Sequence, residues 1–460
     1  MSRFFGPKLA IARAAGGLSR ASGRGGGTTL PGRLLLRMAP DAIARLGSRL
    51  PDGATIVSAT NGKTTTASMI AAALRAAERP PVHNRAGSNM TWGVATALLE
   101  QTGEEGLFEV DEAWLPRVTE QLGPSLIVLG NLFRDQLDRY GEMEALADEW
   151  AKTVAARAGH TGFVLNADDP LIADLGRDPA GERREGVLYF GIEDASQALP
   201  ELQHAFDAKH CRRCGHPYAY ARAFVGHLGH YSCPNCGAER PQPEVAATEI
   251  ELRGMDGSRA TVRTPQGELR LELPLPGLYN VYNALAAVAA GLRLGVAPER
   301  IAAALGEMRA AFGRVETIDV NGTSVSILLI KNPAGANEVL RTLMLEGRRG
   351  GEGIDLWIAL NDRIADGRDV SWIWDADFEL LAGGVRRVVC SGTRAPEMAL
   401  RLKYAGWPEE AIEVVPGIGT SLDNAVAGAQ GRLFALPTYT ALLELRKLLA
   451  DRGLAKEFWQ

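Results

Sequence analysis

The sequence predicts an α/β fold, in which a phosphate-binding domain with a four-cysteine insertion is followed by a Rossmann-like α/β domain. Three observations predict it. The segment "SATNGKTTT" (58–66) joins a β-branched run to a helical pattern; four of the five cysteines form two Cys-x-x-Cys pairs; and apolar runs alternate with helical stretches on both sides of these pairs. The chain has 460 residues and is 46% hydrophobic, which is enough for two or three domains with their own cores.

The charge balance argues against a general affinity for nucleic acid, because the net charge is −5. Residues 1–50 are nevertheless basic, with Asp41 as their only acid. They lack the apolar core and cleavage site of a targeting peptide, and no stretch approaches the roughly 18 apolar residues of a membrane span. We expect a cytoplasmic protein whose basic start is either a solvated surface or a face that approaches the anionic inner side of the membrane.

The first elements follow in the order that a phosphate loop requires. Residues 54–59 predict a strand, and residues 64–78 are rich in helix formers. Residues 125–131 and 162–170 predict further buried parallel strands, and helical stretches lie between them. The Gly-rich residues 18–32 predict a loop. This alternation is typical of a doubly wound domain.

The chain changes character after residue 185. Three runs up to Gly277 alternate polar and apolar residues like antiparallel strands, and a helical pattern follows them. A second set of apolar runs and helices begins near residue 315. We therefore divide the chain into a basic N-terminal segment, a central domain with an insertion at about 205–240, and a C-terminal α/β domain, over residues 1–52, 53–314 and 315–460.

The segment around Lys63 has the composition of a nucleotide site. In such a loop, backbone N–H groups and the helix N-terminus surround the phosphates, a lysine reaches the β and γ phosphates, and the next hydroxyl binds Mg²⁺. Lys63 and Thr64 take these two roles, and Glu109, after an apolar run, is suited to Mg²⁺ unless it is only a solvated acid. The predicted loop residues are Thr60, Asn61, Gly62, Lys63, Thr64 and Thr65.

The four paired cysteines predict a structural zinc ribbon. Cys211 and Cys214 form one pair, Cys233 and Cys236 form the other, and a glycine follows each pair. Four thiolates at this spacing close the coordination shell of Zn²⁺, which favours structure over catalysis. Two disulfides or four free thiols are the alternatives. Cys390 ends an apolar run and is predicted to lie in the core.

The motifs "ATNGKTTT", "FEVDEA", "VLNADDP", "GLYNVYNALAA" and "FGRVE", in this order, resemble those of the Mur ligase superfamily. The resemblance implies that ATP phosphorylates a carboxylate and that an amine then attacks the acyl phosphate. It also implies that Asn280 and Asn283 contact the adenine end of ATP, for which a helix cap is the rival role, and that Arg314 lies near the nucleotide. The chain departs from the superfamily at Ala59, where most members have glycine, and at Tyr279, where many have histidine.

The ribbon, "IKNPAGANEVLRTL" and "DGRDVSW" together are similar to the MurT family, the synthetase subunits of lipid II isoglutaminyl synthases. This resemblance implies a heterodimer with a GatD-type glutaminase, which supplies ammonia. The ammonia amidates the D-glutamate α-carboxylate of the lipid II stem peptide to D-isoglutamine. Members of this family lend an aspartate to the triad of the partner, and we assign this role to Asp369 over Asp366, Asp375 and Asp377. Lys331 and Asn332 are expected to face the substrate or the interface.

Two other functions compete with this assignment. A folylpolyglutamate synthase or another Mur-type amino-acid ligase would use an amino acid in place of ammonia. A zinc-ribbon protein with an ATP-driven switch would bind nucleic acid with strong salt dependence, and the acidic net charge speaks against it.

Overall fold

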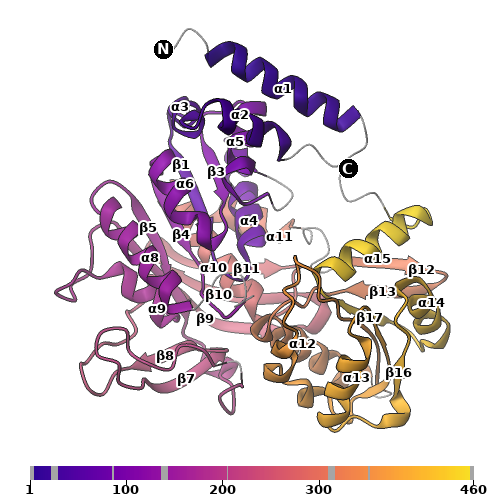
Figure 1. Cartoon of the computed structure of the whole chain (residues 1–460). Coiled ribbons are helices and arrows are strands. Elements are labelled where there is room, and N and C mark those ends of the chain that lie inside the picture. The colour runs from indigo at the N-terminus through magenta and orange to yellow at the C-terminus, as the bar shows by residue number, and fades with distance from the viewer. Residues whose placement is uncertain are drawn as a thin grey trace.

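The computed structural model describes residues 5–21, 29–84, 88–135, 143–204, 206–308, 316–350 and 353–455. Two large sheets are covered by helices on both faces, and a small hairpin lies beside the first sheet (Figure 1). This architecture confirms the predicted α/β fold with its inserted four-cysteine module. Arg314 lies outside the described residues.

The first sheet runs from the end of the N-terminal segment to Leu273. Its central strands are parallel, and β9, β10 and β11 extend it as an antiparallel ribbon, as the alternating runs predict. In spatial order the strands are β11 (Gly267–Leu273), β10 (Ser258–Thr264), β9 (Val245–Leu252), β6 (Val187–Ile192), β5 (Gly162–Asn166), β4 (Leu126–Leu129), β1 (Ala54–Ser58), β3 (Gly106–Glu109) and β2 (Val82–His83).

Two cores lie on opposite faces of this sheet because successive strand residues point to opposite sides. In β1, Val57 packs in the core with α4 and α10, whereas Ile56 packs with α2, α3 and α5. The helices are α1 (Phe5–Ala21), α2 (Leu30–Met38), α3 (Ala42–Gly47), α4 (Lys63–Ala76), α5 (Thr91–Glu100), α6 (Leu115–Leu122), α8 (Met143–Arg157), α9 (Pro170–Ala173), α10 (Leu278–Arg293) and α11 (Pro298–Gly306).

The second sheet has five parallel strands, and β12 is added antiparallel at one edge. Its order is β12 (Glu316–Val320), β13 (Thr323–Ile327), β17 (Leu433–Pro437), β14 (Ile354–Ala359), β15 (Val385–Ser391) and β16 (Ile412–Val414). Its helices are α12 (Pro333–Gly350), α13 (Ala395–Tyr404), α14 (Ile418–Gly428) and α15 (Tyr439–Asp451). Cys390 lies buried in this part, as predicted.

The hairpin of β7 (Ala219–Val225) and β8 (Leu228–Ser232) is inserted in the chain between β6 and β9. It is antiparallel, and the cysteine pairs lie just before β7 and just after β8. The open end of the hairpin therefore carries the four thiols, and its turn is formed by Gly226 and His227.

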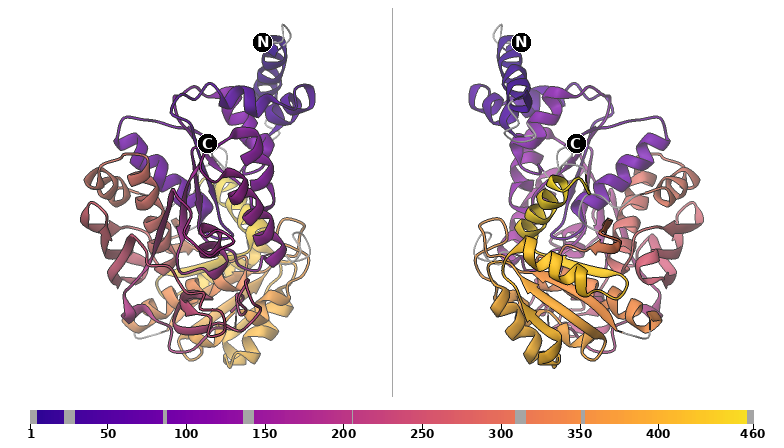
Figure 2. Two further views of the ribbon diagram at one scale, coloured as in Figure 1. Left: turned by 90° about the vertical axis from the view of Figure 1, so that its left-hand side faces the viewer. Right: turned by 90° about the vertical axis from the view of Figure 1, so that its right-hand side faces the viewer.

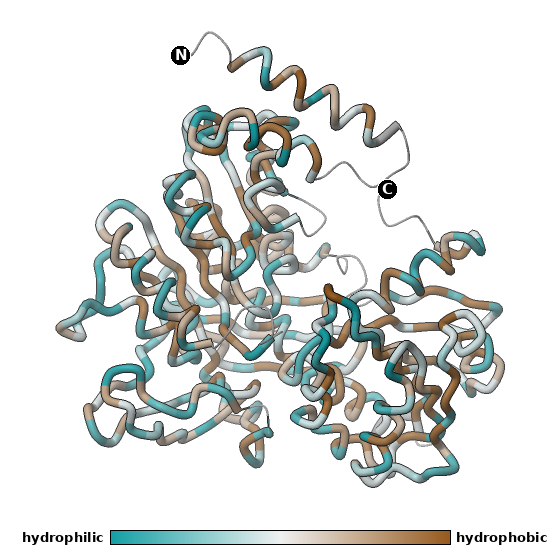
Figure 3. The backbone as a smooth tube through the Cα atoms, viewed as in Figure 1, coloured by the Kyte–Doolittle hydropathy of each residue, from teal (hydrophilic) through white to brown (hydrophobic). Residues whose placement is uncertain are grey.

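The helix α1 was not predicted. The loop expected over residues 18–32 is wrong at both ends, because residues 18–21 end α1 and residues 30–32 begin α2. The alanines of α1 favour a helix, and Phe5, Leu9 and Ala12 recur at helical spacing and are buried. Figure 2 shows α1 standing out from the body, and Figure 3 shows hydrophobic and hydrophilic segments alternating along it. Within the described ranges, no helix combines the length and apolar character needed to cross a bilayer.

Helices α2 and α5 approach so closely that glycine is required at their contact. A Cβ at Gly32 would lie 1.9 Å from the backbone oxygen of Trp92, and the Gly32 N–H donates to Thr96 Oγ1 at 2.9 Å. Gly17 in α1 has open space around its Cβ position. We expect Gly32→Ala to destabilise the protein by about 1–3 kcal/mol because the helices must separate.

The matched change, Gly17→Ala, is expected to leave stability unchanged or to raise it by up to about 1 kcal/mol, since alanine is the better helix former. Thermal unfolding of both variants against the parent measures the difference. Equal melting temperatures for Gly32→Ala and the parent would contradict the packing argument.

Candidate functional site

The loop between β1 and α4 has the geometry that a phosphate site requires. Gly62 has φ = 88°, in the left-handed region, and a Cβ there would lie 2.0 Å from the Oδ1 atom of Asn283. Only glycine combines this backbone conformation with so close a neighbour. Ala59 is not among the described residues with positive φ, so alanine meets no backbone strain where most superfamily members have glycine.

Lys63 is buried at the first position of α4, and a carboxylate balances its charge. Its Nζ atom lies 2.6 Å from Glu112 Oε2 and also donates to the backbone oxygen of Ala59. Burial opposes the charge of Lys63, but Glu112, Asp111 and Glu109 outweigh it and raise the pKa of the lysine. The pKa of Glu112 is lowered, because Lys63 and Lys331 outweigh the effect of burial.

Glu109 lies at the end of β3, beside the strand that leads into the loop. Its side chain is buried, and its backbone is fixed by two hydrogen bonds with the side chain of Asn84, at 2.8 and 2.9 Å. Thr64 follows Lys63 in α4 and is half-buried. The assignment of Thr64 and Glu109 as magnesium ligands stays a prediction.

Asparagines hold the other side of the loop. The Asn61 N–H donates to Asn131 Oδ1 at 2.9 Å, and Asn131 Nδ2 returns a bond to the Asn61 oxygen at 3.0 Å. From α10, Asn283 Oδ1 accepts from Thr66, and its Nδ2 atom donates to Asn280 Oδ1 at 3.0 Å. Both predicted asparagines therefore lie at the loop, and their contact with adenine stays a prediction.

The C-terminal part of the chain reaches the same loop. Lys331 Nζ donates to the backbone oxygen of Thr60 at 3.3 Å and forms an ion pair with Asp135. Asn332 and Asn61 exchange two side-chain hydrogen bonds, at 3.0 and 3.2 Å. Asn332 Oδ1 also accepts from the N–H of Gly335, so the N-terminal end of α12 lies at the loop. Lys331 and Asn332 therefore lie at the phosphate loop.

A pocket opens beside the loop, where four parts of the chain meet. Both polar and apolar side chains line it. The loop, the start of α4 and the end of β4 supply Asn61, Gly62, Thr65, Asn131 and Phe133. Helix α10 and the segment just before it supply Leu275, Tyr279, Asn280, Tyr282 and Asn283. The hairpin supplies Val225 and Leu228, and the C-terminal part supplies Leu329, Lys331, Ala334, Gly335, Glu338 and Val339.

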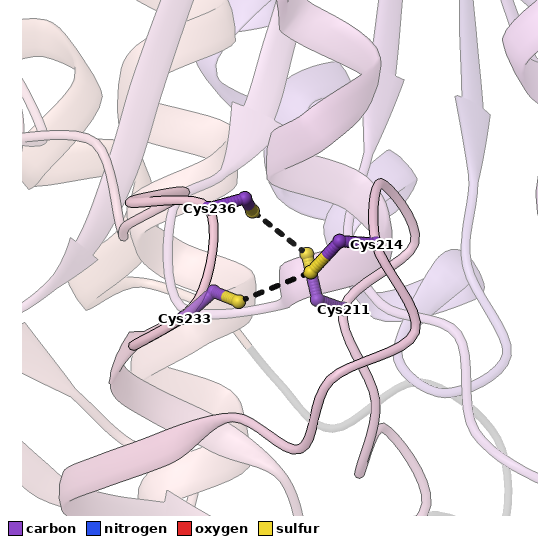
Figure 4. A group of neighbouring side chains, drawn as sticks. All are labelled: Cys211, Cys214, Cys233 and Cys236. Atoms are coloured by element: carbon purple, nitrogen blue, oxygen red, sulfur yellow. Dashed lines mark hydrogen bonds between the residues drawn. The ribbon is translucent and has the colours of Figure 1, made fainter.

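The four cysteine sulfurs converge, as Figure 4 shows. Cys211 and Cys236 have their Sγ atoms 3.6 Å apart, and those of Cys214 and Cys233 are 3.4 Å apart. Zn–S bonds of about 2.3 Å in a tetrahedron place sulfurs roughly 3.8 Å apart, so the cluster is close to the size that zinc requires.

The two cysteine pairs share one backbone pattern. In each turn the glycine after the second cysteine has φ = 73° and donates its N–H to the oxygen of the first cysteine, Gly215 to Cys211 at 2.8 Å and Gly237 to Cys233 at 3.0 Å. Hydrogen bonding by Asn235 and the backbone lowers the pKa of Cys214 to about 6, whereas burial and the neighbouring thiols outweigh a backbone hydrogen bond and raise that of Cys236 to about 12. The donor set and its geometry fit zinc.

The aspartates between residues 366 and 377 have different surroundings. Asp366 is buried and accepts from the N–H and hydroxyl of Thr440 at 2.7 and 2.5 Å. Asp375 pairs with Arg134 at 3.2 Å, and Asp377 is held between His204 and Asn337, each at 2.7 Å. Asp369 is exposed and accepts from the N–H of Ser371, and these bonds lower its pKa.

Sequence reasoning missed Glu112, Asn131 and the hairpin side of the pocket. Glu112 follows the carboxyl end of β3, and ligands of parallel sheets bind at the carboxyl ends of the strands, so its position in "FEVDEA" was a usable signal. Asn131 follows β4 in the same way. The hairpin gave no such signal, because nothing local indicates where its turn packs.

Comparison with known proteins identifies similar chains. The family model of the Mur ligase middle domain matches residues 57–238, and that of the MurT ligase C-terminal region matches residues 329–442. The chain is 32% identical to the lipid II isoglutaminyl synthase (glutamine-hydrolyzing) subunit MurT of Streptococcus pneumoniae, over 94% of both chains. It is also 32% identical to the Staphylococcus aureus N315 protein of the same name, over 95% of this chain and 96% of that one.

Solved structures show the same fold at lower identity. A pseudomurein peptide ligase type C from Methanothermus fervidus matches with a TM-score of 0.68 and 20% identity, covering 89% of this chain and 80% of that one. MurF from Acinetobacter baumannii matches with a TM-score of 0.65 and 19% identity, over 90% and 80% of the two chains.

We expect the purified protein to carry one zinc ion per chain and Cys233→Ser to lose it, because three thiolates leave the coordination shell open. Elemental analysis measures the zinc, and thermal unfolding should show a lower midpoint for this variant. Ser232→Ala, at the exposed neighbouring position, is the control and should keep its zinc. A parent protein without metal would refute the ribbon.

Proposed function

The chain belongs to the MurT family, and we propose that it is an ATP-dependent carbon–nitrogen ligase that amidates lipid II. The observation that carries this proposal is the end-to-end match with the two MurT subunits, at 32% identity over at least 94% of each chain. The name of those relatives specifies a glutamine-hydrolysing synthase and a subunit, so we propose a glutaminase of the GatD type as partner. We also propose domain boundaries at residues 52/53 and 314/315.

In the proposed reaction, an α-carboxylate oxygen of D-glutamate in the stem peptide attacks the terminal phosphorus of ATP, and ADP leaves. Ammonia then attacks the carbonyl carbon of the acyl phosphate, and the C–O bond to phosphate breaks. The products are D-isoglutamine and inorganic phosphate, and ammonia loses one proton. Both attacks are favoured when the reactants are held in place and their charges are balanced.

The residues of the loop support the phosphate half of this reaction. Lys63 and Lys331 are two cations that reach the loop from different parts of the chain. The N–H groups at the start of α4 are the donors that a phosphate requires. Thr64 and Glu109 are the proposed ligands of Mg²⁺, which would neutralise phosphate charge.

The accessibility of Asp369 supports its proposed role toward the partner. An acid that completes a triad in another subunit must be ionised and exposed, and the hydrogen bonds from Ser371 lower the pKa of this exposed carboxyl. The carboxylate of Asp369 therefore keeps its charge to a lower pH than an ordinary aspartate does. Asp366, the second choice, is already committed to Thr440.

A membrane-bound lipid substrate requires the protein to approach the membrane surface. The helices α1 and α2 expose Ile11, Leu18 and Leu30, and Arg33 and Arg37 are exposed beside them. Apolar and basic side chains together suit an anionic interface. We propose that this cytoplasmic protein meets lipid II with its N-terminal helices toward the bilayer.

Lys63→Ala is expected to reduce ATP-dependent amidation by at least about a hundredfold, because a buried cation at the phosphates is lost. Lys152→Ala, an exposed lysine of α8, is the control. Mass spectrometry of lipid II incubated with the complex, ATP and glutamine measures the product. An amino-acid adduct in place of the amide would favour the folylpolyglutamate synthase class, and full activity of Lys63→Ala would remove the phosphate-loop assignment.

Asp369→Asn is expected to reduce glutamine hydrolysis by the complex about a hundredfold or more, since an amide cannot stabilise a charged histidine. Amidation with free ammonium chloride should persist, because the synthetase site is untouched. Asp375→Asn, at the half-buried acid of the same segment that pairs with Arg134, is the control. Glutamate release and lipid II amidation are measured side by side. Unchanged glutamate release in Asp369→Asn would assign the role to another residue.

A further inference from the structure

The turn of the β7–β8 hairpin contributes to the wall of the pocket beside the phosphate loop. Val225 and Leu228 flank the turn, and both are buried and line the pocket beside the phosphate loop. The lining also includes Leu275 and Tyr279 near the start of α10 and Val339 of α12. The hairpin therefore supplies two apolar side chains to a pocket whose lining at the loop includes Asn61 and Lys331.

The hairpin turn is held firmly against the central sheet. His227 is fully buried between the two lining residues, and its ring lies 4.8 Å from that of Phe133. Phe133 lines the same pocket, and its N–H donates to Thr60 Oγ1 at 3.1 Å. The turn therefore touches a residue that itself fixes the phosphate loop.

Hydrogen bonds from the central and the C-terminal parts of the chain hold the end of β7 and the start of β8 in place. The oxygen of Phe224 accepts from Arg341 of α12 at 2.6 Å, and the N–H of Gly229 donates to the backbone oxygen of Asp168 at 2.9 Å. The Asp168 carboxylate accepts from Tyr282, another lining residue, at 2.7 Å, and from Arg240 at 2.6 Å. Arg240 follows the second cysteine pair, so the ribbon is linked to the pocket at two points.

The zinc site is at the other end of the same hairpin. Cys233 directly follows β8, and five residues of extended strand span about 17 Å from Leu228 to Cys233. A two-stranded hairpin is marginally stable by itself in water. A metal that joins the thiols before β7 to those after β8 closes the open end, and this fixes both strands that lead to the turn.

We propose that Val225 and Leu228 are base-contacting residues, and that zinc raises the affinity for adenine nucleotides by holding the hairpin in place as the wall of their pocket. The inference rests on the proposed function only in taking the loop as a nucleotide site. It assigns a nucleotide-binding role to the ribbon. The four thiols alone would suggest only a structural role. The apolar side chains pack on the faces of the base, and the loop holds the phosphates.

The test measures binding of ADP and of inorganic tripolyphosphate by isothermal titration calorimetry on the full chain with its partner. Leu228→Ala should raise the Kd for ADP about tenfold, since a buried leucine contact is lost, and should leave the Kd for tripolyphosphate unchanged. Leu202→Ala, the same change at an exposed position just before the inserted segment, should leave both unchanged. The zinc content of all variants should equal that of the parent.

Removal of zinc from the parent by a chelator should weaken ADP binding by a similar factor, and added Zn²⁺ should restore it. Circular dichroism and thermal unfolding confirm that the fold persists, and Leu228→Ala tests the wall independently in a zinc-loaded protein. Unchanged ADP affinity in Leu228→Ala, or an equal loss for tripolyphosphate, overturns the proposal. A parent that binds no ADP would instead overturn the proposed function.

Discussion

The ion pair between Lys63 and Glu112 is the interaction on which the rest of the site depends. A buried ammonium group is costly unless a carboxylate or a phosphate balances it. Glu112 supplies that balance at 2.6 Å and keeps the lysine charged at the first residue of α4. The loop can therefore fold around a cation before any nucleotide arrives, and a phosphate can later take over part of the pairing.

The order of the parallel strands explains why residues far apart in the chain meet at one point. The loop follows β1, Glu112 follows β3 and Asn131 follows β4, so each lies at the carboxyl end of a neighbouring parallel strand. Lys331 and Asn332 then join the loop from the second sheet. The geometry of this site therefore depends on the relative position of the two sheets. A movement of one sheet against the other would displace Lys331 and Asn332 from the phosphate loop.

The sequence predicted what is encoded locally. Lys63 and the four cysteines lie in short motifs whose chemistry depends on spacing, and the strand and helix around the loop follow from their periodicity. The hairpin turn was missed because its role comes from tertiary contacts between separate segments, whereas Glu112 had a local signal in its position after β3. The helix α1 was missed for another reason: its glycines and arginines obscured a short apolar pattern.

The charge at the loop gives a reason for a divalent cation. Among the described side chains, Lys63 and Lys331 face the carboxylates of Glu109, Asp111, Glu112 and Asp135. The carboxylates exceed the lysines even before a polyphosphate is added, so the two lysines alone do not balance a bound nucleotide. A hard cation with oxygen ligands offsets both the excess carboxylates and the phosphates. The acidic residues that hold Lys63 in place are thus also a physical reason to expect a metal ion with the nucleotide that we propose for this loop.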